Sequence, residues 1–241
     1  MIGVLGVFVA AAALAAPPPL DPAHLPKLPG RGLARETTAG VELQTLAGRP
    51  LGTLAGLNLA PDKAVSHSLV LRGGGRLLTL DLEERRVRRF YEAPSTVPTC
   101  RLTDARIHRE LFVCGAAVRT VTYGPPGSRP ALRVVARAPG KVGHWEWAEF
   151  APRGGGFLAQ WSAECEVPVA YLVSDGRLRS YGQDSAALGW LPGGDALIHF
   201  PNGPCAGDSK AVRGIYAVPR TGKPRLVLRT ARFAQYAMWG G

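Results

Sequence analysis

The sequence has few of the residue patterns on which hydrolases and metal proteins depend. Its 241 residues include four cysteines and five histidines, with no C-x-x-C pair and no histidine at finger-like spacing from a cysteine pair, so a zinc site is not expected. No G-x-S-x-G motif marks a serine hydrolase. No stretch keeps a helical hydrophobic period, which argues against a helical fold. The sequence predicts no cofactor.

Acidic residues are scarce beside basic ones. The chain has 18 Asp and Glu against 29 Lys and Arg, a formal net charge of +11. Such a positive field favours acidic partners, namely an anionic cell-envelope polymer, lipid head groups, nucleic acid or an acidic protein. A composition rich in Arg, Ala, Gly and Pro accounts for the same charge without any specific partner, and the sequence leaves this alternative open.

The N-terminus has the pattern of a signal peptide over residues 1–16. Its apolar run has the length of a signal-peptide core, is short for a membrane span, and ends in the small residues Ala15 and Ala16. No Lys or Arg precedes the run, which leaves an uncleaved anchor as the alternative. No cysteine follows it, so a lipoprotein anchor is not expected. We therefore expect a secreted or periplasmic protein without a transmembrane span in its mature part.

Proline is dense over residues 17–31, which predicts an extended, mobile linker ahead of one domain over residues 32–241. Within that domain, short apolar runs alternate at period two and are broken by Gly, Pro, Asp and Asn. This is the pattern of β-strands joined by tight turns, so the sequence predicts an all-β fold.

Two kinds of strand pair recur along the domain. The first joins two apolar runs through a turn with Pro, Asp or Gly, and its copies lie at residues 57–65, 100–114, 147–158 and 188–198. The second is a hairpin with a glycine or charged turn, and its copies lie at residues 41–51, 77–87, 118–135, 171–178 and 215–226. Asp175-Gly176 and Thr221-Gly222 suit hairpin turns that need a positive φ.

The two units alternate with a period of roughly 40 to 48 residues, which is the length of a propeller blade. The sequence therefore predicts a small β-propeller of about five four-stranded antiparallel blades. The first hairpin lacks its inner strand, and residues 234–241 have an inner-strand pattern without the rest of a blade. We expect the C-terminal strand to join the N-terminal blade and close the ring.

The segment Trp190–Gly194, followed by Ile215–Val218 and Thr221–Lys223, resembles the blade signature of TolB-type, WD-repeat-like propellers. The likeness extends over residues 145–229. In that family an aromatic residue, Pro, Asp and Gly form the inner turn, and here Gly193 stands where the family has Asp. The resemblance implies an exported scaffold for protein contacts, without an active site of its own.

The even number of cysteines and the predicted export favour disulfides. Cys100 and Cys114 flank a turn at residues 104–109, so they face each other if that turn is a hairpin. Cys165 and Cys205 follow equivalent inner strands of successive blades, where a bond would join the two blades. Free buried thiols are the alternative for both pairs.

Tryptophans on the predicted inner strands are candidates for binding. Trp145 and Trp147 share one face if their strand is regular, and Trp161 lies near a loop that can serve as a binding rim. Packing between blades is the alternative for all three residues.

A basic cluster on an outer hairpin is the second binding candidate. It consists of Arg85, Arg86, Arg88 and Arg89. A solvated outer strand that discourages edge pairing explains the same residues. Few aromatic residues accompany these arginines, so nucleic acid is not an expected partner. We expect a non-enzymatic, monomeric propeller that binds a protein or an anionic cell-envelope polymer.

A carbohydrate-active enzyme is the alternative from a different class, because five-bladed propellers include glycoside hydrolases. That chemistry needs two carboxylates from different blades in the central channel. The candidates are Asp62, Asp104, Glu146, Glu149 and Asp195. Glu146 and Glu149 have opposite parity, so at most one is expected to face the channel. A scaffold should instead line its channel with small and apolar side chains; metal binding by His67 and His199 there is a weaker alternative.

Overall fold

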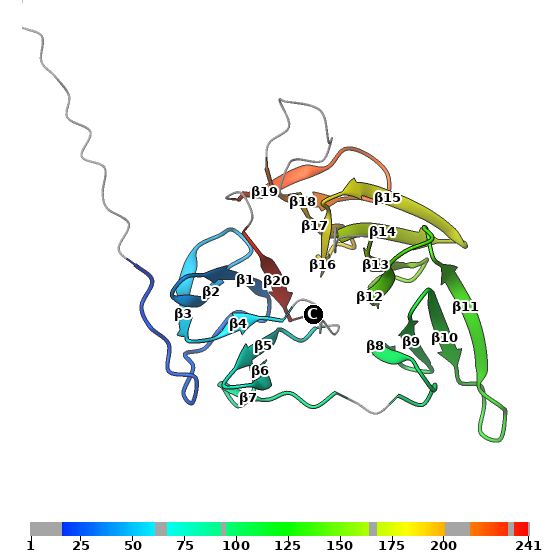
Figure 1. Ribbon diagram of the computed structural model, residues 1–241, viewed down its shortest axis with the longest axis horizontal. Helices are drawn as coiled ribbons and strands as arrows, with labels where there is room; N and C mark the ends of the chain where they lie inside the picture. Colours follow the sequence, from blue (N-terminus) through cyan, green and yellow to red (C-terminus); the bar gives the residue numbers. More distant parts are fainter. Residues whose placement is uncertain are drawn as a thin grey trace, which may run out of the picture.

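The computed structural model describes residues 16–60, 67–92, 95–163, 168–200, 213–230 and 234–240. Within these ranges the chain forms strands only, grouped in five four-stranded antiparallel sheets that stand in a ring (Figure 1). The fold is a five-bladed β-propeller, which confirms the prediction. Among the described residues there is no helix long and apolar enough to cross a membrane.

Each sheet follows the chain from an inner strand to an outer one, except the first, which takes its inner strand from the C-terminus. That sheet holds β20 (Tyr236–Trp239), β1 (Gly32–Thr37), β2 (Gly40–Gln44) and β3 (Pro50–Ala55). The next holds β4 (Asn58–Leu59), β5 (Val70–Gly73), β6 (Arg76–Asp81) and β7 (Arg86–Arg89).

The other three sheets have the same order. One holds β8 (Arg101–Arg106), β9 (Arg109–Cys114), β10 (Ala117–Thr122) and β11 (Ala131–Arg137). One holds β12 (His144–Phe150), β13 (Phe157–Ser162), β14 (Pro168–Ser174) and β15 (Arg177–Gln183). The last holds β16 (Ala186–Trp190), β17 (Ala196–Phe200), β18 (Gly214–Val218) and β19 (Arg225–Arg229).

The ring is closed where the two ends of the domain pair, as the sequence predicted. β20 runs antiparallel to β1, with Leu33 opposite Met238. The Trp239 ring is 1% exposed and lies over Gly32, where an added Cβ would come within 2.2 Å of the ring. Glycine at this position therefore leaves room for the tryptophan ring to pack where β1 and β20 pair.

The hairpin turns follow from local sequence. Asp175 and Gly176 both have positive φ, at 50° and 72°, which matches the turn predicted for this dipeptide. The Cys100–Cys114 disulfide is also local, because the β8–β9 register places Arg101 opposite Val113 and so brings the two cysteines together. Cys165 and Cys205 lie outside the described residues.

A β-bulge in β12 changes which tryptophans share a face. The pairing with β13 shifts between Trp145 and Trp147, so Glu146 is an extra residue on this strand. Trp145 packs against Trp161 on the side of the β8–β11 sheet, while Trp147 packs on the side of the β16–β19 sheet. The expectation that Trp145 and Trp147 share one face is therefore wrong, because it assumed a regular strand.

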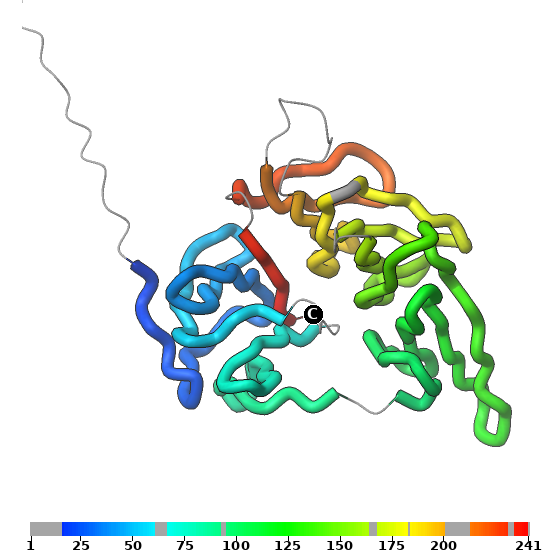
Figure 2. The backbone as a smooth tube through the Cα atoms, in the orientation of Figure 1, coloured from blue at the N-terminus to red at the C-terminus, as the bar shows by residue number. Residues whose placement is uncertain are grey.

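The proline-rich segment before β1 is extended, and it is attached to the ring. The Leu20 amide donates to the Thr53 carbonyl at 2.8 Å, and Pro19 and Thr53 form a parallel bridge at the outer edge of β3. The Leu25 amide donates to the Arg85 carbonyl at 2.6 Å, next to β7. Figure 2 shows this segment along the outside of the first two sheets. Residues 1–15, which include almost all of the predicted signal peptide, lie outside the described residues.

Candidate functional site

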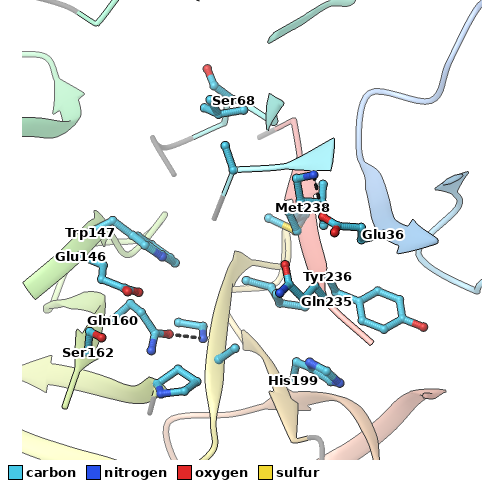
Figure 3. Close-up of a pocket in the computed structure, with 18 of the residues that line it drawn as sticks. Glu36, Ser68, Glu146, Trp147, Gln160, Ser162, His199, Gln235, Tyr236 and Met238 are labelled. Carbon is cyan, nitrogen blue, oxygen red and sulfur yellow. Dashed lines mark hydrogen bonds between the residues drawn. The ribbon is translucent and has the colours of Figure 1, made fainter. Parts of the chain in front are cut away.

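The centre of the ring holds a cavity of about 1010 Å³. Its described lining comes from four of the five sheets, chiefly from the inner strands β4, β12, β16 and β20. Figure 3 shows Glu146, Gln160 and Ser162 on one side of this space and strand β20 on another. The inner strands converge here because each blade starts at the ring axis, so residues distant in sequence become neighbours.

Carboxylates gather in the cavity. Its lining includes Glu36, Glu146, Glu149 and Asp184, against a single arginine, Arg72, among the described residues. The sequence predicted that at most one of Glu146 and Glu149 faces the channel, and this is wrong. Glu146 is the extra residue of the β12 bulge, so simple alternation of side chains does not hold between it and Glu149.

Two of the remaining carboxylates proposed from the sequence, Asp104 and Asp195, are not among the lining residues of this cavity. Asp104 is buried, and it accepts a hydrogen bond from the Phe150 amide at 2.8 Å, which ties the β8–β11 sheet to the next sheet. Asp195 closes the β16–β17 turn, where its carbonyl accepts from the Leu191 amide at 2.9 Å. Asp62 lies outside the described residues. The carboxylate of Asp104 is therefore structural here.

Two histidines lie among the carboxylates without neutralising them. Burial lowers the pKa of His67, whose Nε2 atom lies 3.9 Å from Glu149 Oε1. The imidazole is therefore neutral near pH 7, and the contact is not a full ion pair. Burial lowers the pKa of His199 to about 4, and its Nε2 atom lies 3.1 Å from the Thr230 hydroxyl oxygen. The cavity thus keeps a negative formal charge in a strongly basic protein.

The buried His199 makes stability depend on pH. Its pKa in the folded protein is about 4, below the ordinary 6.5, so the unfolded chain takes up a proton first as the pH falls. We expect the free energy of unfolding to fall by about 3 kcal/mol more in the wild type than in His199→Gln between neutral pH and pH near 4. Urea unfolding at the two pH values measures this difference.

The matched control for this experiment is His24→Gln, since His24 is largely exposed, with 86% of its side chain accessible. That variant should retain the full pH dependence of the wild type. If His199→Gln and His24→Gln lose stability equally on acidification, the neutral state of the buried histidine is not the cause.

Hydrogen bonds hold the wall of the cavity in one conformation. Gln160 accepts from the Ala187 amide at 2.7 Å and donates to the Trp161 carbonyl at 3.3 Å, so it bridges two sheets. Trp147 stands beside it and is 6% exposed. Of the three tryptophans named as binding candidates, Trp147 lines the cavity, while Trp145 and Trp161 are core residues at 2% exposure.

The basic cluster lies at β7 and the turn before it, and none of its residues lines the cavity. Three of its four arginines make side-chain contacts with neighbouring residues. Arg86 pairs with Glu84, and Arg88 lies 2.9 Å from Asp81. Arg89 stacks over Tyr91 at 5.1 Å, and Arg85 occupies the turn with φ of 50°. These contacts fit the solvated outer strand better than a free anion site.

Sequence reasoning missed Glu36, His144 and Asp184. His144 begins β12 and Asp184 lies two residues before β16, so both stand at the entrance of an inner strand. Asn58 and Gln235 occupy similar positions at β4 and β20. These four residues are all polar, and each lies at or just before the start of an inner strand. This shared position is the sequence signal that could have identified them as residues of the cavity. Among the described residues, no group of three or more His, Cys, Asp or Glu could hold a metal ion.

Comparisons with known proteins do not identify a family for this chain. No family model matches the chain, and no curated protein matches it. One similar solved structure is the extracellular domain of a candidate one-component system from B. thetaiotaomicron, with TM-score 0.34 and 14% identity over 81% of this chain and 26% of that one. Another is a candidate 6-phosphogluconolactonase from Bacteroides uniformis, with TM-score 0.34 and 12% identity over 85% of this chain and 84% of that one. This chain spans about a quarter of the first protein's length.

Proposed function

We propose that this protein is an exported, non-enzymatic propeller whose central cavity binds a small polar ligand that carries a positive charge. The observation that supports the proposal is the acidic lining of this cavity, formed by Glu36, Glu146, Glu149 and Asp184, in a chain of net charge +11. The small and apolar channel expected of a scaffold differs from this lining, which includes four carboxylates. Carboxylates from different sheets instead meet at one water-accessible space.

Electrostatics favour a cation in this space. His67 and His199 are neutral near pH 7, so they leave the carboxylate field in place. The low-dielectric walls strengthen that field relative to bulk water. Trp147 adds an aromatic surface at the same site, which suits the apolar stem of an ammonium or guanidinium ligand. The cavity is of the size that small-molecule sites commonly have.

Export is supported by the Cys100–Cys114 disulfide, since such bonds persist in oxidising compartments. The signal-peptide pattern of residues 1–16 agrees with it. The TolB-type resemblance adds protein partners to the proposal. An anionic envelope polymer, which the net charge favours, would be repelled by the cavity and fits the outer surface instead.

The proposal predicts binding of an oligoamine by the cavity. We expect the linear triamine spermidine to bind in calorimetry, and the double variant Glu146→Gln, Asp184→Asn to weaken this binding by about tenfold or more. The removal of two negative charges from the lining is the physical reason. Glu84→Gln with Asp175→Asn is the control, because it removes equal charge outside the cavity.

Three outcomes would contradict the cavity proposal. The first is equal weakening in the two double variants, which would mean that spermidine responds only to the overall charge. The second is no binding at all by the wild type. The third is equally tight binding of a neutral polyol of the same length, which would mean that the cavity does not select for charge.

Glycoside hydrolysis is the second candidate. It is favoured by one observation, namely that carboxylates of two different sheets, Glu36 on β1 and Glu146 on β12, line the same cavity. Release of reducing ends from a panel of oligosaccharides, abolished in Glu146→Gln, would establish it. No turnover of the panel, together with spermidine binding, would support the binding protein.

A further inference from the structure

The carboxylates of the central cavity lie at two depths. The inner strands run through the ring in the same direction, because every sheet has the same order from its inner strand outwards. Glu146 is the third residue of β12, and Asp184 lies just before β16, so both are at the end of the cavity where the inner strands begin. Glu36 is at this end too, since its amide donates to the Gln235 carbonyl ahead of β20. Glu149 is the last residue but one of β12 and therefore lies towards the far end.

Groups from three inner strands meet around Glu149 at the far end. A Cβ added to Gly189 on β16 would lie 3.3 Å from Glu149 Oε2 and 2.4 Å from Met238 Cε on β20. His67 Nε2 lies 3.9 Å from Glu149 Oε1, and the His67 carbonyl accepts from the Gly240 amide at 3.2 Å, just beyond β20. Burial lowers the pKa of His67, so this imidazole is neutral near pH 7. The Glu149 oxygens are therefore the acceptors that a positively charged group would meet there.

The wall between the two ends is mainly apolar. Gln160 lies opposite Trp147 in the β12–β13 pairing and accepts from the Ala187 amide at 2.7 Å, so Trp147 and Ala187 lie at one level. Gln160 also donates to the Trp161 carbonyl, so its oxygen and nitrogen are both used within the wall. Figure 3 shows Trp147 directed from β12 into the cavity. The apolar lining between the ends includes Trp147, Ala187, Leu188 and Ala237.

An apolar wall between two acidic ends favours a particular distribution of charge in the ligand. A charged group held against these side chains would lose its hydration, which is costly, whereas an alkyl chain gains from the same contact. Glu146 and Glu149 are three residues apart on β12, which corresponds to roughly 10 Å along a strand. An extended chain of about eight methylene groups has a comparable length.

We propose that the cavity selects a linear diamine whose two ammonium groups are separated by an unbranched alkyl chain, an inference that rests on the proposed binding of a cation. One ammonium pairs with Glu146 and Asp184 where the inner strands begin. The alkyl chain lies against Trp147, and the other ammonium reaches Glu149. The site therefore recognises the two ends of its ligand rather than the total charge.

The test compares two ligands of equal length on the wild-type protein. Spermidine and 1,8-diaminooctane have the same number of atoms between their terminal nitrogens, and an internal ammonium of spermidine stands in place of one methylene of the diamine. We expect 1,8-diaminooctane to bind about tenfold more tightly in calorimetry, although it carries less positive charge. 1-Aminooctane, which lacks the second ammonium, should bind about tenfold more weakly than the diamine.

A substitution at the far end provides the matched variant. Glu149→Gln keeps the size of the side chain and removes its charge, so it should weaken binding of 1,8-diaminooctane by about tenfold. Its effect on 1-aminooctane should stay below about twofold, because a single ammonium can remain at Glu146 and Asp184. The control, Glu84→Gln, removes the same charge outside the cavity and should change neither affinity by more than about twofold. The ligand comparison on the wild type decides the matter if Glu149→Gln does not fold.

Several results would overturn the diamine proposal. Spermidine binding as tightly as 1,8-diaminooctane, or more tightly, would mean that the middle of the cavity accepts a charge, and cation binding itself would then stand. Equal affinities for the diamine and 1-aminooctane would mean that only one end binds an ammonium group. Equal effects of Glu149→Gln and Glu84→Gln would mean that the ligand does not reach the far end. No binding of any of these amines would overturn this proposal together with the proposed function.

Discussion

Replacement of Trp239 with alanine should lower the free energy of unfolding by about 3 to 5 kcal/mol, the usual cost of deleting a large buried aromatic side chain. The Trp239 ring is 1% exposed, and it packs in one core cluster with Leu43, Leu59 and Leu71. Its indole nitrogen donates to the Pro29 carbonyl at 3.2 Å. The substitution therefore removes core volume and a hydrogen bond at the place where the ring closes.

Guanidinium unfolding of the wild type and of Trp239→Ala measures this loss. Tyr91→Ala is the control, since Tyr91 is 71% exposed and its removal should cost less than about 0.5 kcal/mol. Trp190→Ala is a second comparison, because Trp190 is equally buried but packs in a different core cluster, with Trp147 and Ile198. Amide exchange should rise first in β1 and β20 for Trp239→Ala. A loss below about 1 kcal/mol would mean that the closure tolerates a cavity.

Removal of the Cys100–Cys114 disulfide should cost about 3 kcal/mol, because the bond closes a loop between cysteines that are 14 residues apart. The double variant Cys100→Ala, Cys114→Ala avoids a free thiol. The strands β8 and β9 should still pair, since Phe112 on β9 is 1% exposed and packs in a core cluster with Val97 and Val121. We therefore expect a folded protein whose unfolding midpoint lies at lower denaturant.

Reductant provides the control for the disulfide experiment. The wild type should lose stability when reduced, and the double variant should lose only what a Cys165–Cys205 bond contributes. A double variant that reductant leaves unchanged would mean that Cys165 and Cys205 are not joined. Equal midpoints for the oxidised wild type and the double variant would contradict the stabilising role of Cys100–Cys114.

Local sequence was sufficient for the architecture. The turn at Asp175-Gly176 and the alternation of two strand-pair units predicted four-stranded blades, because each unit pairs with its immediate neighbour in the chain. The same locality predicted the Cys100–Cys114 bond across one hairpin. The closing pair of β1 and β20 was also predictable, since each end carried part of a blade and neither could remain an open edge.

The candidate site depended on contacts that no local pattern records. Glu36 and Asp184 are far apart in the sequence, and only the ring brings both to one cavity. The bulge at Glu146 changed which side chains of β12 share a face. The single extra residue means that side chains before the bulge and side chains after it no longer follow one alternation. The neutral state of His199 likewise follows from burial among neighbouring strands.

The sequence by itself determined the strands, their order and the number of blades, because these rest on pairing between chain neighbours. Only the tertiary structure decided which charges share the central cavity, because that depends on how five separate sheets meet at one axis.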